Sequence, residues 1–168
     1  MPIPPASARA GDTLGPQVRA ARLVDLDPLT LYGLLRLRVD VFVVEQDCAY
    51  PELDGVDTEA TTEHLWIEAD GVPVATVRTL VDAQGVHHLG RVATRRDHRG
   101  HGYASTLVQA GLDRIGGHAV HIGAQAYLER WYERFGFRRA GKDYLEDGIP
   151  HLPMVRPELT PRRGAQTS

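Results

Sequence analysis

The sequence predicts a mixed α/β fold of the α+β type, in which helices pack on a largely antiparallel sheet. Two patterns carry this prediction. Residues 63–94 alternate apolar and polar side chains with a period of two, and turn signals at 70–71 and 83–85 divide them into three antiparallel strands. Beyond residue 94, segments of helical periodicity alternate with short apolar runs, which indicates that further helices and strands complete the same sheet.

A strand and a helix are expected before this region. Residues 17–25 alternate well enough to form a first strand. Asp27-Pro28 combines an N-cap residue with a proline at the first helical position, and apolar side chains then recur at helical spacing, which predicts a helix over 28–42. Acidic side chains dominate 45–63, where neither lysine nor arginine occurs, and a proline and a glycine there predict a loop or a short irregular helix.

The remaining elements follow from the same periodicities. The expected strands are 64–69, 72–81, 86–94, 119–124, 137–145 and 151–156. The expected helices are 103–115 and 127–135. A glycine follows each of these helices, at Gly116 and Gly136, where a left-handed C-terminal cap favours this residue.

The overall composition limits the class of protein. A chain of 168 residues favours one domain, which we expect over 17–157, with poorly ordered tails at 1–16 and 158–168. The formal net charge of -3 is too small to indicate a nucleic acid or a membrane as a partner. Cys48 is the only cysteine, and no segment has the apolar length that spans a bilayer, so we expect a cytoplasmic protein without disulfides.

The strongest functional signal lies between the third strand of the 63–94 region and the helix that follows it. Gly100-His101-Gly102 joins these elements, and two glycines one residue apart let the backbone approach a ligand closely. The first amides of a helix lack intrahelical acceptors, and Arg99 and its neighbouring arginines add positive charge, so this loop suits a phosphate group. A simple turn is the alternative interpretation. The pattern is neither the dinucleotide fingerprint nor a P-loop.

Two motifs resemble those of the GCN5-related N-acetyltransferase (GNAT) family. Arg99-x-x-Gly102-x-Ala104 is similar to the family signature Arg/Gln-x-x-Gly-x-Gly/Ala, and residues 132–137, Tyr-Glu-Arg-Phe-Gly-Phe, resemble its Tyr-x-x-x-Gly-Phe segment. Blocks at 37–38, 41–46, 54–55, 123–126 and 146–151 resemble the ElaA-like subgroup. The resemblance implies a GNAT-type mixed, mostly antiparallel central sheet of about six to seven strands flanked by about four helices.

The resemblance implies that acetyl-CoA binds in a cleft where the strand ending at Thr94 splays from the strand ending near Ala124. The pantetheine arm would pair with the backbone of Val92 and Thr94, and a backbone N–H at Val92 or Ala93 would stabilise the oxyanion. The pyrophosphate would bind amides over 99–104. The residues expected to bind the cofactor are Val92, Ala93, Thr94, Arg99, Gly100, His101, Gly102, Tyr103, Ala104, Ser105, Gln125 and Tyr132.

Tyr132 matches the family tyrosine that protonates the leaving thiolate, with packing beside Trp131 as the alternative role. A base is also needed, because a protonated amine must lose its proton before it attacks. The candidates at ends of elements, each with capping or turn stabilisation as the alternative, are Glu45, His64, Glu146 and His151. The predicted catalytic residues are Tyr132, Glu45 and His151.

The acceptor is expected to be a small-molecule amine or a peptide amine. The acidic run 45–63 lies where the family places its acceptor-binding loop, so it favours a cationic acceptor such as a polyamine, an aminoglycoside-like amine or a lysine-rich peptide. A solvated loop face is the alternative. No metal is expected, and the protein is expected to be a monomer or a homodimer. The alternative functions are a non-catalytic acyl-CoA-binding or sensor domain of the same fold and a protein-interaction module.

Overall fold

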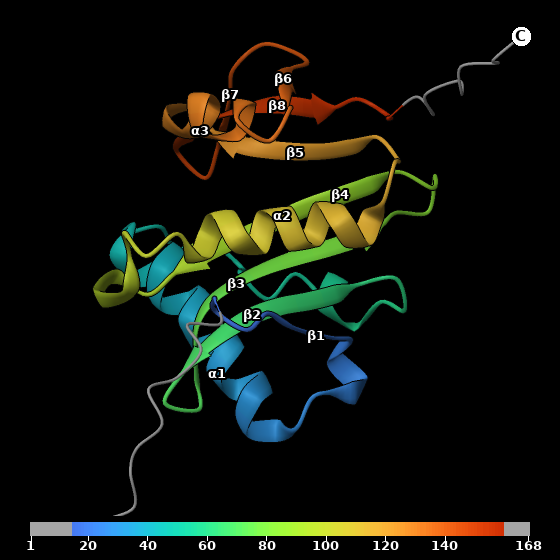
Figure 1. Ribbon diagram of the computed structural model, residues 1–168. Helices are drawn as coiled ribbons and strands as arrows, with labels where there is room; N and C mark the ends of the chain where they lie inside the picture. Colours follow the sequence, from blue (N-terminus) through green and yellow to red (C-terminus); the bar gives the residue numbers. More distant parts are fainter. Residues whose placement is uncertain (1–14, 160–168) are drawn as a thin grey trace, which may run out of the picture.

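The computed structural model describes residues 15–159, so the predicted tails lie almost entirely outside the described residues, and the predicted domain bounds stay a prediction. One mixed sheet of eight strands forms the centre of the fold (Figure 1). The strands are β1 (Arg19–Ala21), β2 (Glu63–Ala69), β3 (Val72–Val81), β4 (His87–Thr94), β5 (Val120–Gln125), β6 (Arg138–Arg139), β7 (Tyr144–Glu146) and β8 (Ile149–Arg156). The α-helices of the described chain are α1 (Pro28–Val39), α2 (Tyr103–Ile115) and α3 (Glu129–Glu133). The predicted fold class is confirmed, with slightly more strands and slightly fewer helices than expected.

The strand order is β1-β2-β3-β4-β5-β8-β6, and β7 also pairs with β8. β1 to β4 form an antiparallel meander, which confirms the three strands and the two turns predicted over 63–94. β4 and β5 are parallel, and the chain passes from one to the other through α2. β8 then pairs antiparallel with β5, β6 and β7. In Figure 1, β5, β8 and α3 form the upper part of the molecule, above the meander.

Helix α1 begins at the predicted residue. Asp27 Oδ1 accepts hydrogen bonds from the backbone N–H groups of Leu29 and Thr30, both at 3.0 Å, which confirms the predicted N-cap. The α-helix ends earlier than predicted, at Val39, and continues as a π-helix over Asp40–Glu45. Such wide turns are frequent at functional sites, and the last residue of this one lines the cleft described below.

Two predicted elements are shorter in the structure. The first strand pairs with β2 only over Arg19–Ala21, because a 3-10 turn at Leu23–Asp25 follows it closely. The helix expected over 127–135 consists of a 3-10 turn, Ala126–Leu128, and the short helix α3. The glycine predicted to stop it, Gly136, has a φ of 86°, a left-handed conformation that glycine adopts easily.

The strand expected over 137–145 is divided into β6 and β7. Both pair with β8, which contains Pro150 and Pro153. The nitrogen of Pro153 carries no hydrogen to donate, so the ladder on the β6–β7 side of β8 is interrupted there, whereas β5 pairs continuously with the other side of β8. The chain leaves the ladder between β6 and β7, where the N–H of Ala140 donates to the carbonyl of Pro153 at 2.8 Å.

Apolar side chains pack on both faces of the sheet. The larger core includes residues of α2, α3 and the central strands, among them Leu65, Val77, Leu89, Leu107, Leu112, Ile122, Tyr132 and Met154. On the other face, Leu37 and Val41 pack against Ala93. α2 lies close to the sheet, since a Cβ added at Gly111 would come within 3.1 Å of Leu89 Cδ1. Over residues 15–159, no helix combines the length and the apolar character needed to cross a membrane.

Candidate active site

A cleft opens where β4 and β5 diverge. The two strands pair only near their first residues, His87 with Val120 and His88 with His121. Beyond these pairs the strands separate, and a cavity of about 1310 Å³ is lined by residues of both. The predicted splay is therefore present, and the cavity exceeds the size of an ordinary small-molecule pocket.

Nearly all of the predicted site residues line this cleft. Those that do are Glu45, Val92, Ala93, Thr94, Arg99, Gly100, Gly102, Tyr103, Ala104, Ser105, Gln125, Tyr132 and His151. His101 is the exception among the predicted site residues. Its Nδ1 lies 3.0 Å from the carbonyl oxygen of Arg99, and its exposed ring stacks on Tyr103. The fold thus brings the π-helix, β4, the glycine loop, β5, α3 and β8 to one cavity.

Strand β4 contains a bulge at the edge of the cleft. Thr76 of β3 faces Ala93 and Arg78 faces Gly90, so one residue of β3 faces two residues of β4. Arg91, in the bulge, has a φ of 52°. This is the left-handed region, which residues other than glycine seldom occupy.

The bulge determines which backbone groups of β4 face the cleft. Before the bulge, the carbonyl of Val86 accepts a hydrogen bond from the preceding turn at 2.9 Å, so even-numbered residues direct their backbone groups toward β3. After the bulge, the N–H of Arg95 donates to the carbonyl of Val74 at 2.8 Å. In this part of β4 the odd-numbered residues therefore direct their backbone groups toward β3. Val92 and Thr94 therefore direct their N–H and C=O groups away from β3, toward the cleft.

The loop before α2 offers backbone donors. Gly100 and Gly102 have φ angles of 80° and 77°, and a Cβ added at either would meet nothing within 4 Å. Gly102 is the N-cap of α2, and no side chain caps this end. Within residues 15–159, no acceptor is in hydrogen-bond range of the N–H groups of Tyr103, Ala104 or Ser105. Free amides at a helix N-terminus form a site for an anion.

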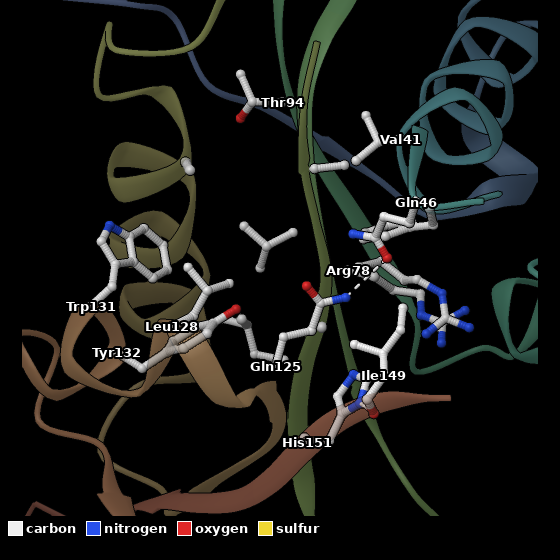
Figure 2. A pocket seen from close by; sticks show the side chains of 18 of the residues that line it. Val41, Gln46, Arg78, Thr94, Gln125, Leu128, Trp131, Tyr132, Ile149 and His151 are labelled. Atoms are coloured by element: carbon white, nitrogen blue, oxygen red, sulfur yellow. Dashed lines mark hydrogen bonds between the residues drawn. The ribbon is translucent and has the colours of Figure 1, made fainter. Parts of the chain in front are cut away.

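Polar side chains lie inside the cleft. Thr94 Oγ1 is buried and has no hydrogen-bond partner in the described part of the chain. Tyr132 is only 7% exposed, and Figure 2 shows its hydroxyl pointing into the cavity. Burial raises the pKa of Tyr132, so this phenol stays protonated at neutral pH. Gln125 Nε2 donates to Gln46 Oε1 at 3.0 Å (Figure 2), a partner that the sequence did not indicate.

The two predicted bases have different surroundings. Both carboxylate oxygens of Glu45 accept hydrogen bonds from the guanidinium of Arg99, at 2.7 and 2.8 Å, and this interaction lowers the pKa of Glu45. His151 Nδ1 lies 2.8 Å from the carbonyl oxygen of Ile149. A carbonyl oxygen only accepts, so Nδ1 carries a hydrogen, and in the neutral ring the lone pair is then on Nε2. The carboxylate of Glu45 is thus bound to Arg99, whereas His151 Nε2 has no hydrogen-bond partner within residues 15–159.

The other two candidate bases differ in position. Glu146 lines the cleft, and its carboxylate lies 3.8 Å from His151 Nε2. His64 does not line the cleft. It is 2% exposed, and burial lowers its pKa, so it lies in the interior as a neutral imidazole.

A buried ion network that the sequence pattern did not predict lies beside the cleft. Arg38 of α1 is 1% exposed; its guanidinium pairs with the carboxylate of Glu52 and donates to Asp57 Oδ1 at 2.7 Å. Arg78 of β3 donates to Asp54 Oδ2 at 2.8 Å and to Asp57 Oδ1 at 3.0 Å. Buried charges persist when they are paired in this way. The available signal was an arginine within each of two apolar segments, together with an acidic run that lacks basic residues.

The acidic run 45–63 therefore carries less free negative charge than its composition suggests. Arginines from outside the run pair with most of its acids, namely Glu45, Glu52, Asp54, Asp57 and Glu63. Three acidic side chains that line the cleft, Asp82, Glu146 and Asp147, have no arginine or lysine partner in the described chain, and Asp82 is hydrogen-bonded to His88. Two of the three, Glu146 and Asp147, are neighbours at the β7–β8 turn.

The ion network predicts acid sensitivity. Burial alone would raise the pKa of Asp54, but the hydrogen bond from Arg78 and the charges of Arg78 and Arg91 lower it from 3.8 to about 2. A carboxyl group whose pKa is lower in the folded state stabilises the fold above its unfolded pKa. This stabilisation is lost as the pH falls through the window between the two values. We expect the free energy of unfolding to decrease as the pH falls from about 4 to about 2.

The measurement is urea unfolding at a series of pH values, followed by tryptophan fluorescence. Asp54→Asn should be less stable than the wild type at pH 7 and should lose less stability between pH 4 and pH 2. An equal loss in both proteins would contradict the assignment of this titration to Asp54.

Comparison with known proteins agrees with the geometry of the cleft. Residues 38–157 match the model of the acetyltransferase (GNAT) domain family. The chain is 50% identical over 137 residues to a UPF0039 protein of Mycobacterium tuberculosis, which covers 79% of this chain and 88% of that protein. It is 36% identical over 138 residues to Escherichia coli ElaA, covering 79% of this chain and 90% of ElaA.

Solved structures show the same likeness. An acyl-CoA N-acyltransferase from Pseudomonas aeruginosa matches with a TM-score of 0.79 and 38% identity, over 84% of this chain and 99% of that one. The crystal structure of E. coli ElaA matches with a TM-score of 0.79 and 33% identity, with the same coverage. The chain therefore belongs to the GNAT acetyltransferase family and is an ElaA-like member of it.

Proposed function

We propose that this acyltransferase is an N-acetyltransferase, which moves the acetyl group of acetyl-CoA directly to a primary amine while both substrates are bound. One observation carries the proposal. The free amides at the start of α2, the cleft-facing backbone of β4 and the hydroxyl of Tyr132 line one continuous cavity. Such a cavity can hold an anionic phosphate group, an extended amide chain and a reacting centre together.

The residues present fit acetyl-CoA. The N–H groups of Tyr103, Ala104 and Ser105 are available to phosphate oxygens, and the buried hydroxyl of Thr94 is available to a further polar group. The edge of β4 at Val92 can pair with an amide-containing arm in the manner of a strand. When bound, acetyl-CoA would supply an activated acetyl group and a thiol leaving group. Over residues 15–159, no cluster of three histidine, cysteine or acidic side chains is arranged to hold a metal ion.

We assign the proton donor to Tyr132. Its hydroxyl points into the cavity and is protonated at neutral pH, and a phenol near a developing thiolate can donate its proton. The ring packs edge-on against Trp131 at 4.8 Å and against Phe137 at 5.8 Å between centroids, which holds the hydroxyl in place. The packing of Tyr132 beside Trp131, the alternative role that the sequence suggests, is therefore compatible with a role as proton donor.

We assign the base to His151 in preference to Glu45. His151 lines the cleft on the β8 side and in its neutral form has a lone pair on Nε2, whereas the carboxylate of Glu45 is bound to Arg99. A cationic acceptor fits the same side, because Glu146 and Asp147 provide negative charge there. Both small-molecule amines and peptide amines remain within this proposal.

The proposal is tested by thiol release from acetyl-CoA with three amines that share a three-carbon chain: propylamine, 1,3-diaminopropane and 3-aminopropanoate. We expect turnover, fastest with the diamine, together with a product whose mass has increased by one acetyl group. If turnover is slowest with the diamine, the preference for a cationic acceptor is rejected, but the acetyltransferase activity is not. Tight binding of coenzyme A without turnover of any amine would favour the non-catalytic acyl-CoA-binding domain, and absence of binding would reject the function altogether.

The choice of base gives a separate prediction. His151→Gln is expected to lower kcat/KM at pH 7 by about a hundredfold, because glutamine cannot accept the proton of an ammonium group. Glu45→Gln, the matched control on the opposite side of the cleft, should lose less than about tenfold. A larger loss with Glu45→Gln than with His151→Gln would reverse the assignment.

A further inference from the structure

Arg91 lies in the bulge of β4 and makes an unusual set of contacts for a residue at a positive φ. Its Nε lies 2.9 Å from Glu52 Oε2, and its Nη2 lies 3.1 Å from Asp54 Oδ2. Glu52 is 3% exposed, and it is held in turn by Arg38 and by the hydroxyl of Tyr50. The guanidinium of Arg91 is therefore bound at two points to a part of the protein that is itself fixed.

The backbone conformation of Arg91 is strained. Its φ of 52° is unfavourable for any residue with a side chain, and glycine would be the usual choice at such a position. A return of Arg91 to a regular strand conformation would remove the bulge. The alternation of β4 would then continue unchanged, and Val92 and Thr94 would direct their N–H and C=O groups toward β3 instead of the cleft.

We propose that Arg91 is a positioning residue whose two ion pairs hold β4 in its bulged conformation. We call these two ion pairs, Arg91 with Glu52 and Arg91 with Asp54, the clamp. Through the clamp, two residues of the acidic run 45–63 fix the strand whose backbone faces the cleft. The clamp also explains why arginine occupies this position, since its fork can reach two carboxylates at once. The inference rests on the proposed function only in using coenzyme A as a probe of that backbone.

The test compares two substitutions that remove the same ion pairs. Arg91→Ala leaves a residue that resists the left-handed conformation, whereas Arg91→Gly leaves one that adopts it without strain. In calorimetry, the Kd for coenzyme A is expected to rise about tenfold for Arg91→Ala and to stay within about threefold of the wild type for Arg91→Gly. Arg114→Ala is the control, because Arg114 also pairs with the acidic run, at Glu63, but lies outside the cleft.

Wild-type affinity of Arg91→Ala, or equal weakening in both Arg91 variants, would overturn the proposal. A second comparison covers the case in which Arg91→Ala does not fold. Asp54→Asn should weaken coenzyme A binding several-fold in the wild type but have no further effect in Arg91→Gly, where the clamp is already absent. Equal effects in both backgrounds would also overturn the proposal.

The proposed function and the clamp can fail independently. If the wild type does not bind coenzyme A, the proposed function fails, and the same variants are compared by their Tm. The clamp then still predicts a higher Tm for Arg91→Gly than for Arg91→Ala. It also predicts that Asp54→Asn lowers the Tm less in Arg91→Gly than in the wild type.

Discussion

Replacing Gly102 by aspartate is expected to raise the Kd for coenzyme A about a hundredfold, which corresponds to about 3 kcal/mol. Two effects add. The φ of 77° at Gly102 is unfavourable for a residue with a side chain. An aspartate at the N-cap would also place a carboxylate beside the free amides of α2, where it competes with a phosphate for the same donors and repels it. Isothermal titration calorimetry with coenzyme A measures the change.

Gly85→Asp is the matched control for this substitution. Gly85 has a φ of 80°, and a Cβ added there would meet nothing within 4 Å, as at Gly102. It lies in the turn between β3 and β4, outside the cleft, so its replacement imposes the same backbone strain without approaching the anion site. We expect the control to lose stability but to keep the affinity of the wild type. Unchanged affinity in Gly102→Asp would contradict a phosphate site at α2.

The sequence predicts well which residues of the glycine loop and of the start of α2 line the cleft, because the determinants of this region are local. A strand, two glycines and an uncapped helix follow one another over 87–115, and the chemistry of free amides depends only on this order. His101 shows the limit of the same reasoning. The loop directs the His101 ring onto Tyr103 outside the cleft, although the residues on either side of it line the cavity.

The fold follows the sequence pattern except where backbone pairing overrides it. Alternation predicts the meander, and the N-cap at Asp27 predicts the start of α1. The separate strands β6 and β7 could not be read from their own residues, because prolines in their partner β8 determine where pairing is possible.

The charge of the acidic run 45–63 depends on contacts between distant segments, which no local pattern reveals. The acidic run 45–63 appeared to be a negative rim, but its carboxylates bind arginines of α1, β3 and β4. The pairing requires the fold to place these elements around the run, so charge composition alone overestimated the free charge. The bulge at Arg91 was not expected for the same reason, since a positive φ at an arginine is maintained by tertiary contacts.

Tyr132→Phe is expected to lower kcat about a hundredfold while the Kd for coenzyme A stays near that of the wild type. The substitution removes one hydroxyl and keeps the ring that packs on Trp131 and Phe137, so the fold and the donor site should persist. What is lost is the proton that the buried phenol retains at neutral pH. Thiol release from acetyl-CoA, with the amine that the wild type acetylates fastest, measures kcat, and calorimetry measures Kd.

The change in kcat, compared with the change in the Kd for coenzyme A, distinguishes a proton donor from a packing residue. If Tyr132 only packs, Tyr132→Phe keeps the ring against Trp131 and Phe137 and should leave kcat, Kd and Tm near those of the wild type. A donor role lowers kcat alone. Tyr32→Phe, an exposed tyrosine on α1, is the control for the loss of a hydroxyl and should change neither quantity. If Tyr132→Phe keeps the kcat of the wild type, Tyr132 is not the proton donor, and that role falls to another group in the cleft or to water.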